Sequence, residues 1–332
     1  MAKIAVIGAG SWGTALSIAL SSLGHSIRLW AYENAVAKSI QERRENLLFL
    51  PGARLPESIT ATSSLPHAVQ DATFVLTVTP SHVCRRIYER MLPDLHPDML
   101  FVSATKGLEE ITLMRMSEVI RSVVRRRFDP RLTVLSGPSF AREVVRGDPT
   151  AVVAASRDGE TAQCVQQAFS SASLRLYTSS DEIGVELGGA VKNVIAIAAG
   201  VVDGLGLGHN PKAALITRGL SEMTRLACAC GARSETLAGL AGMGDLVLTC
   251  TGALSRNRSV GVELGKGRKL KEITESMQEV AEGIKTTASA VTLAQRHGIE
   301  MPITFQVQRI LQDQISPRDA IRELMERTLK QE

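Results

Sequence analysis

A lysine lies in the middle of one of the most apolar stretches of the chain. The segment GAVKNVIAIAAG, residues 189–200, has the composition of a buried helix but carries Lys192 and Asn193. A lysine buried without a partner is costly or loses its proton, so Lys192 must pair with a carboxylate or face a polar cleft. It is therefore either a structural ion-pair partner or a functional amine. On its helix face, room for a ligand is expected beside Gly188, Gly189 and Ala196. Asp245, in GLAGMGDLVLTC, is equally isolated, and each could be the other's counter-ion.

A glycine-rich turn near the start of the chain predicts a dinucleotide site. The strand-like KIAVI runs into GAGSWG, which places glycines at Gly8, Gly10 and Gly13, and a helix-like stretch follows. In such a turn the first glycine permits the tight bend, and the second lets the backbone approach a pyrophosphate. The third lets helix and strand pack closely. We favour this interpretation over a purely structural turn because a second strand, SIRLW, comes next.

The end of that second strand bears on the choice of cofactor. An acidic residue there would select the ribose 2′-hydroxyl of NAD, but this chain has Ala31 and Tyr32, with Glu33 beyond. Arginines at 28, 43 and 44 are candidates to approach a 2′-phosphate. The sequence thus allows NADP and does not exclude NAD.

Other polar residues follow the predicted strands, where ligands bind in a parallel sheet. They occur in VTPS at 78–81, ATKG at 104–107 and SGPSFA at 136–141. Lys106 could point its ammonium into a cleft there, although a surface lysine is the alternative. Further on, SRNRS places two arginines around Asn257, and guanidinium groups match phosphate or carboxylate oxygens, unless the segment is a solvated basic loop.

Two different patterns divide the chain. Up to about residue 180, short β-rich runs alternate with helical stretches, which predicts a mainly parallel, Rossmann-type sheet covered by helices. Beyond that point only helical signals remain, with helix starts expected at Asn210-Pro211 and Ser316-Pro317. We therefore expect an α/β dinucleotide-binding domain over residues 1–185 and an all-helical substrate domain over 186–332.

Composition excludes several classes of protein. The 332 residues carry 38 Lys and Arg against 34 Asp and Glu, with three Tyr and two Trp, which argues against a nucleic-acid binder. Five scattered cysteines without a CxxC pair indicate a reduced cytoplasmic protein with no metal site. No signal peptide is evident, and the apolar stretch around 187–202 is expected to be a core helix, not a membrane span.

Taken in order, several motifs resemble those of the bacterial NAD(P)-dependent glycerol-3-phosphate dehydrogenases. They are GAGSWGTALS, TKGLE, SGPSFAREV, GAVKNVIAIAAG, GLAGMGDLVLTCT with SRNR, and AEGIKT. The resemblance implies reversible reduction of dihydroxyacetone phosphate to sn-glycerol 3-phosphate with NADP or NAD, supplying phospholipid biosynthesis. The last forty residues carry little of it.

The resemblance also implies roles for individual residues. Lys192 would transfer the proton, and burial and Lys106 would lower its pKa while Asp245 opposes that shift. Substrate contacts would come from Lys106, Gly137, Ser139, Lys192, Asp245, Ser255, Arg256 and Asn257. Cofactor contacts would come from Gly8, Gly10, Ser11, Trp12, Gly13, Tyr32, Lys106, Ala141, Arg256, Val280 and Glu282. Many relatives have a basic residue or histidine in place of Tyr32, which leaves the preference for NADP open.

Two alternatives are compatible with the same residues. Another Rossmann dehydrogenase with a helical second domain, of the 3-hydroxyacid or 6-phosphogluconate type, would share the glycine-rich turn and a helix lysine. A non-catalytic NAD(P) sensor would share the turn but has no need of Lys192. We expect a small phosphorylated substrate, no nucleic-acid partner, no stable membrane insertion and a homodimer.

Overall fold

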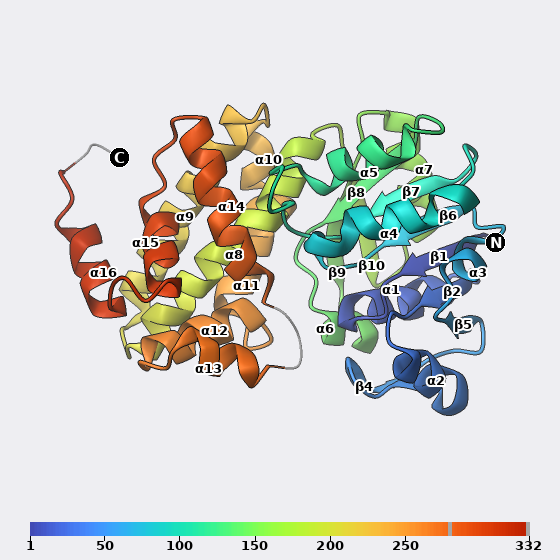
Figure 1. Ribbon diagram of the computed structural model, residues 1–332, viewed down its shortest axis with the longest axis horizontal. Coiled ribbons are helices and arrows are strands. Elements are labelled where there is room, and N and C mark those ends of the chain that lie inside the picture. Colours follow the sequence, from blue (N-terminus) through green and yellow to red (C-terminus); the bar gives the residue numbers. More distant parts are fainter. Residues whose placement is uncertain (278–280, 330–332) are drawn as a thin grey trace. The chain divides into compact units, whose positions relative to one another are not determined.

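The computed structural model describes residues 1–277 and 281–329. The chain forms two compact units. The first comprises Met1–Glu109 and Met114–Glu186, and the second comprises Glu110–Leu113 and Leu187–Glu332. Figure 1 follows the chain from the strands of the first unit to the helices of the second. The short segment Glu110–Leu113 belongs to the second unit although it lies early in the sequence.

The first unit is built on an eight-stranded sheet. The strands lie in the order β10-β9-β8-β7-β6-β1-β2-β5, and all neighbouring pairs are parallel except β8 and β9. They are β1 (Lys3–Ile7), β2 (Ser26–Trp30), β5 (Ile59–Thr62), β6 (Phe74–Thr77), β7 (Leu100–Ser103), β8 (Arg131–Ser136), β9 (Thr150–Ala155) and β10 (Leu174–Ser179). The predicted mainly parallel sheet is confirmed.

The strand order shows where a ligand would bind. From β8 to β5 the order is that of the doubly wound Rossmann sheet, whose winding reverses between β1 and β6. Ligands of such sheets bind beyond the carboxyl ends of the strands at that reversal. The loops after β1, β6, β7 and β8 hold the glycine-rich turn and the polar residues that the sequence pattern predicts for this edge of the sheet.

Three strands were not predicted. One is β5, which has only four residues, and the others form the antiparallel pair of β3 (Glu45–Asn46) and β4 (Leu50–Arg54). Strand β3 has only two residues, and β4 contains Pro51 and Gly52, which are typical of turns and not of strands.

Helices complete the first unit around two apolar cores. They are α1 (Ser11–Ser21), α2 (Asn34–Arg43), α3 (Leu65–Val69), η1 (Ser81–Val83), α4 (Cys84–Met91), η2 (Leu92–Asp94), α5 (Met116–Val124), α6 (Ala141–Arg146) and α7 (Gly159–Phe169). Successive side chains of β1 enter different cores: Ile4 and Val6 pack in one cluster, Ala5 and Ile7 in the other. A strand buried on both faces must be apolar throughout, which explains the unbroken run KIAVI.

The second unit is helical, and no strand follows β10 among the described residues. Its helices are α8 (Glu182–Gly204), whose first turn belongs to the first unit, α9 (His209–Ala229), α10 (Ser234–Ala238), the π-helical turn η3 (Leu240–Gly244), α11 (Asp245–Thr251), α12 (Arg256–Gly265), α13 (Leu270–Glu275), α14 (Glu282–Arg296), α15 (Pro302–Leu311) and α16 (Pro317–Met325). The predicted all-helical character is confirmed.

Of the two predicted helix starts, one is confirmed and one is wrong. Ser316 caps α16, and its hydroxyl accepts a hydrogen bond from the backbone N–H of Asp319 at 3.1 Å. Helix α9 instead begins at His209 with Gly208 as its N-cap, so Asn210 is not the cap. Pro211 still lies in the first turn, where a missing N–H costs nothing.

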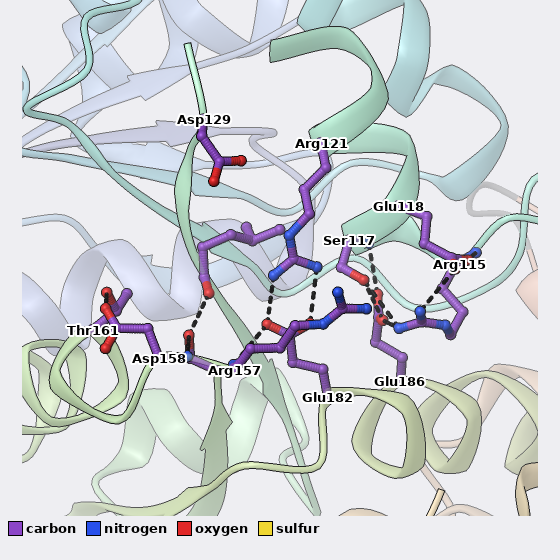
Figure 2. A network of polar contacts seen from close by, with 12 residues as sticks. Arg115, Ser117, Glu118, Arg121, Asp129, Arg157, Asp158, Thr161, Glu182 and Glu186 are labelled. Carbon is purple, nitrogen blue, oxygen red and sulfur yellow. Dashed lines mark hydrogen bonds and ion pairs between the residues drawn. The ribbon is translucent and has the colours of Figure 1, made fainter. Parts of the chain in front are cut away.

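Helix α8 is long and apolar enough to cross a membrane, but the apolar part is wholly buried inside the protein. Its first turns are held in the first unit by buried ion pairs with Arg121 of α5 and with Arg115, the N-cap of α5 (Figure 2). Arg121 donates two hydrogen bonds to Glu182, at 2.8 and 2.6 Å, and Arg115 donates one to Glu186 at 2.5 Å. Burial raises the pKa of Glu186, and the Arg115 charge opposes that rise. The start of α8 is therefore held by charges that would be costly to leave unpaired.

Candidate functional site

The three glycines of the GAGSWG turn occupy three different environments. Gly8 has φ +123°, and a Cβ there would lie 2.5 Å from the carbonyl oxygen of Val78. A Cβ on Gly13 would lie 1.9 Å from the carbonyl oxygen of Gly8, whereas one on Gly10 would meet no atom within 4 Å. Helix α1 then starts at Ser11 without a side-chain cap. The turn thus packs through two glycines, while the third leaves open space beside a helix N-terminus, as a pyrophosphate requires.

A buried asparagine that the sequence analysis missed supports this turn. The side-chain amide of Asn46 donates hydrogen bonds to the carbonyl oxygen of Ala9 and to the hydroxyl of Thr14, both at 2.8 Å. Asn46 is completely buried. Its partners are more than thirty residues away in the chain, so no local pattern in the sequence could have identified it.

Trp12 and Ala141 come together at this end of the first unit. Both pack against one small apolar cluster that contains Ala15 of α1, Leu50 of β4 and Val144 of α6. Two residues predicted to contact the cofactor, from segments far apart in the sequence, therefore share one surface.

The end of β2 differs from expectation. Ala31 is fully buried in the core, so its side chain cannot reach a ribose, whereas Tyr32 is 68% exposed and lies edge-on to the Trp30 ring. Arg28 donates hydrogen bonds to the carbonyl oxygens of His67 and Gln70. The first exposed position after β2 is therefore Tyr32, not Ala31.

The other two arginines near this strand also differ. Arg44 donates hydrogen bonds to the carbonyl oxygens of Leu55 and Pro56. Arg43 is exposed at the last position of α2. Arg28 and Arg44 are thus occupied by backbone carbonyls, and Arg43 is the remaining candidate.

Three predicted substrate-binding residues meet at the ends of β7 and β8. The Lys106 ammonium donates a hydrogen bond to the carbonyl oxygen of Gly137 at 3.4 Å, and the Ser139 hydroxyl donates to the same oxygen at 3.0 Å. Gly137 has φ +147°, and a Cβ there would lie 2.9 Å from Cα of Val152. Only glycine fits this position, so the turn that brings Lys106 and Ser139 together is fixed by packing.

In the second unit, the Lys192 ammonium is buried and held by two oxygens. It forms an ion pair with the carboxylate of Asp245 and donates a hydrogen bond to the hydroxyl of Thr249 at 2.7 Å. The Thr249 hydroxyl in turn donates to the carbonyl oxygen of Asp245 at 2.6 Å. Lys192 is 6% exposed and Asp245 1% exposed. The expected pairing of Lys192 with Asp245 is confirmed.

Thr249 is the residue of this cluster that the sequence analysis missed. It lies four residues after Asp245 on α11, the spacing that brings two side chains to one helix face, and that spacing is the signal that could have found it. The neighbouring thiol of Cys250 is not reactive, because burial raises its pKa to about 12.

Room for a ligand was expected beside Gly188, Gly189 and Ala196. At Gly188 there is no such room. A Cβ on Gly188 would lie 2.5 Å from the carbonyl oxygen of Ala241. This glycine accommodates the backbone of η3, the π-helical turn directly before Asp245. Because Gly188 has no side chain, the segment before Asp245 can pack close to α8, and no pocket is left there.

The SRNRS segment forms the start of α12. The Ser255 hydroxyl caps the helix by accepting a hydrogen bond from the backbone N–H of Arg258 at 3.2 Å. Arg256 is the first helical residue and is exposed. Arg258 instead donates a hydrogen bond to Asp203 at 2.8 Å. Of the two arginines, Arg256 is thus placed beside the helix N-terminus, and Arg258 serves an internal ion pair.

Asn257 links three helices. Its amide nitrogen donates to the side-chain oxygen of Asn193 on α8 at 3.0 Å, and its own side-chain oxygen accepts from the backbone N–H of Gly283 on α14 at 2.9 Å. Glu282 is the first residue of α14. The predicted cofactor residue Val280 lies outside the described residues.

The predicted residues therefore form two groups, one in each unit. The first contains the glycine-rich turn, Trp12 and Ala141, with Lys106, Gly137 and Ser139 on neighbouring strand ends. The second contains Lys192 and Asp245 with the starts of α12 and α14. Among the described residues, no cluster of three or more His, Cys, Asp or Glu side chains could hold a metal ion.

Comparison with known proteins gives a consistent result over nearly the whole chain. Residues 3–162 match the family described as NAD-dependent glycerol-3-phosphate dehydrogenase N-terminus, and residues 181–322 match its C-terminus counterpart. Glycerol-3-phosphate dehydrogenase [NAD(P)+] of Koribacter versatilis is 61% identical, and that of Acidobacterium capsulatum is 55% identical, each over 98% of both chains. The crystal structure of glycerol-3-phosphate dehydrogenase from Coxiella burnetii superimposes with a TM-score of 0.94 at 42% identity, covering 98% of this chain and 99% of that one.

Proposed function

The chain belongs to the family of NAD(P)-dependent glycerol-3-phosphate dehydrogenases, and from that premise we propose which of its residues carry out the reaction. The reaction is the reversible reduction of dihydroxyacetone phosphate to sn-glycerol 3-phosphate with NADPH or NADH. The product supplies the glycerol phosphate of phospholipid biosynthesis. In our assignment the first group of residues holds the dinucleotide, and the second group transfers the proton.

The glycine-rich turn and α1 hold the pyrophosphate of the dinucleotide. The open space at Gly10 and the uncapped N-terminus of α1 support this assignment, because both suit a close anionic ligand. Trp12 and Ala141 flank the cofactor from their shared apolar cluster. When bound, the nicotinamide donates or accepts the hydride.

Lys192 carries out the proton transfer. Hydride addition to the carbonyl carbon leaves a negative charge on the carbonyl oxygen, and the Lys192 ammonium gives that oxygen a proton. The Asp245 carboxylate and the Thr249 hydroxyl hold the ammonium in one direction. In the reverse reaction, the neutral amine takes the proton from the hydroxyl of glycerol 3-phosphate.

The start of α12 binds the phosphate of the substrate. Arg256 supplies a guanidinium at the first position of the helix, where the backbone N–H groups also favour an anion. In the first unit, Lys106 is the proposed contact for both the cofactor and the substrate, and its hydrogen bond to the carbonyl oxygen of Gly137 directs its ammonium. The substrate phosphate therefore has partners that do not take part in proton transfer.

One observation carries this proposal: a lysine and an aspartate are buried together in an apolar helical unit, with a threonine hydroxyl as the third partner. A structural ion pair between two helices would have the same contacts. The two possibilities predict different kcat values for a variant that lacks the Lys192 ammonium but keeps the apolar part of the side chain.

Replacement of Lys192 by methionine makes that distinction. We expect kcat to fall by about 10²–10⁴-fold, the usual contribution of general acid catalysis, with NADPH affinity little changed. The matched control is Lys269→Met, since Lys269 belongs to the same unit but forms an exposed pair with Asp313. If the folded Lys192→Met protein binds NADPH and turns over within a few-fold of wild type, Lys192 is only a structural partner of Asp245.

We further propose that residues 1–185 form the dinucleotide-binding domain and residues 186–332 the substrate domain. The glycine-rich turn in the first part and Arg256 in the second support this division. A substitution at Gly10 should therefore change the dissociation constant of NADPH while leaving binding of glycerol 3-phosphate unchanged.

A homodimer in the cytoplasm is the proposed state of the protein. Exposed apolar side chains on the second unit, Met243, Val247 and Leu254, support self-association. All five cysteines are free, which suits a reducing compartment. Light scattering that gives the mass of a single chain, 35.7 kDa, at micromolar concentration would contradict the dimer. Recovery of the protein in a membrane or periplasmic fraction would contradict the location.

A further inference from the structure

Helices α8 and α12 touch through their backbones. Gly200 and Gly204 on α8, and Gly261 and Gly265 on α12, repeat at a spacing of four residues. A Cβ on Gly200 would lie 2.0 Å from the carbonyl oxygen of Arg258, and one on Gly261 would lie 2.0 Å from the carbonyl oxygen of Ile197. Ordinary van der Waals contact begins at 3.4 Å. Glycine at these positions therefore sets the smallest separation that the two helices can have.

The same contact continues one turn further along both helices. A Cβ on Gly204 would lie 2.2 Å from the carbonyl oxygen of Val262, and one on Gly265 would lie 2.6 Å from that of Val201. The four glycines thus interlock over two turns, and every nearest obstructing atom is backbone. Backbone cannot rotate aside as the end of a flexible side chain can, so even a methyl group must push the helices apart.

Polar contacts also join the two helices beside and before the glycine interlock. Asp203, near the end of α8, accepts a hydrogen bond from Arg258 of α12 and forms ion pairs with Arg258 and with Lys212 of α9. Asn193 of α8 accepts a hydrogen bond from Asn257 of α12, and both residues precede the glycines on their helices. The ion pair therefore lies beside the interlocked glycines, and the amide pair lies before them. The amide pair joins the residues that directly follow the proposed proton donor and the proposed phosphate-binding arginine.

We propose that Gly200, Gly204, Gly261 and Gly265, together with Asp203, are positioning residues that set the length of substrate the enzyme accepts. Lys192 lies on α8 and the start of α12 carries Arg256, so the separation of these helices sets the distance from the proton donor to the phosphate site. That distance must match the chain between the reacting carbonyl oxygen and the phosphate. The inference rests on the proposed function, because it takes Lys192 and Arg256 as the two ends of the substrate site.

Widening of the helix contact should affect specificity and not only stability. A misplacement of about 1 Å can cost on the order of 10²-fold in rate, because the reacting groups must meet in one geometry. A substrate with one more methylene between carbonyl and phosphate would fit the widened site better than dihydroxyacetone phosphate does. Widening should therefore change the ratio of the two substrates, which simple destabilisation would not do.

The test is a graded series of glycine substitutions. Gly261→Ala introduces the shorter contact and Gly265→Ala the milder one, at 2.0 and 2.6 Å. Asp203→Asn weakens the ion pairs with Arg258 and Lys212 without adding volume. Gly208→Ala is the matched control, because a Cβ there meets nothing within 4 Å and the residue belongs to the same unit. Each protein is assayed with dihydroxyacetone phosphate and with its homologue 4-hydroxy-3-oxobutyl phosphate.

We expect Gly261→Ala to raise KM for dihydroxyacetone phosphate and to shift the ratio of kcat/KM toward the longer homologue by about tenfold or more. Gly265→Ala and Asp203→Asn should shift that ratio in the same direction by less, Gly208→Ala should leave it unchanged, and KM for NADPH should stay constant throughout. If Gly261→Ala does not fold, Gly265→Ala and Asp203→Asn decide the matter.

Two results overturn the proposal, and they differ from failure of the proposed function. The positioning role is wrong if folded Gly265→Ala and Asp203→Asn keep the wild-type ratio of the two substrates. It is also wrong if both substrates lose activity equally. The proposed function itself fails only if the wild-type protein does not reduce dihydroxyacetone phosphate with either cofactor.

Discussion

The glycine-rich turn and the Lys192 cluster are both suited to a charged ligand, but the turn uses backbone and the cluster uses side chains. At the turn, Gly8 and Gly13 fix the backbone, and the segment GAGSWG contains no ionisable residue. At the cluster, the side chains of Lys192 and Asp245, 53 residues apart, meet inside an apolar unit. The glycine-rich turn is formed by consecutive residues, so a short stretch of sequence specifies it. The Lys192–Asp245 pair forms only when the fold brings two distant segments together.

This difference predicts how substitutions behave. Changes at the turn should act through shape, so their effects depend on where a Cβ would point. Changes in the second unit should act through charge, so their effects depend on which ion loses its partner.

After Lys192→Met, the largest effect is expected for Arg256→Ala. Loss of the guanidinium should remove about 2–5 kcal/mol of phosphate binding if the pair is desolvated, seen mainly as a higher KM for dihydroxyacetone phosphate. Steady-state kinetics at saturating NADPH measure it. An unchanged KM would remove Arg256 from the phosphate site.

Two glycine substitutions at the turn sharpen the comparison. Gly10→Ala should keep the wild-type melting temperature and raise the dissociation constant of NADPH by about tenfold or more, because its Cβ enters open space reserved for the ligand. Gly13→Ala should instead lower the melting temperature, since its Cβ would collide with the carbonyl oxygen of Gly8. Thermal unfolding and fluorescence titration of both proteins measure these effects. Equal behaviour of the two variants would mean that the glycines do not differ in role.

A smaller effect is expected at Tyr32. Tyr32→Asp should place a carboxylate at the exposed end of β2 and shift preference from NADPH toward NADH by roughly tenfold, because it would repel a 2′-phosphate and accept a hydrogen bond from a 2′-hydroxyl. The ratio of kcat/KM for the two cofactors measures this. A ratio that stays at the wild-type value would place the ribose elsewhere.

The smallest effect is expected at Ser316, far along the chain from either group. Ser316→Ala should remove the cap of α16 and cost about 1 kcal/mol of stability. Urea unfolding measures the loss, and kcat and KM should remain those of wild type. A change in activity would mean that α16 contributes to the site.

The sequence was sufficient for features that depend on neighbours in the chain. KIAVI followed by GAGSWG predicted a strand, a glycine turn and a helix, and the structure contains each of them. The cap of α16 at Ser316 was predicted for the same reason. Isolation of two charges in apolar surroundings also predicted the pairing of Lys192 with Asp245, because a buried charge needs a partner.

Features that depend on distant backbone could not be predicted in this way. Gly188 was expected to leave room for a ligand, but the backbone at Ala241 fills that room. Asn46 supports the glycine turn from another segment, and Ala31 is buried in the apolar cluster that also contains Val36 and Ala37 of α2. Each of these outcomes depends on which segments become neighbours, and residue type at one position does not contain that information.

The most direct test of the central claim, that this enzyme reduces a phosphorylated ketone, is a comparison of two substrates by the wild-type protein. NADPH oxidation is followed with dihydroxyacetone phosphate and with unphosphorylated dihydroxyacetone. We predict that kcat/KM is higher for the phosphorylated ketone by at least about 10²-fold, since only that substrate engages Arg256 and the start of α12. Equal kcat/KM for the two ketones, or no oxidation with either, would contradict the claim.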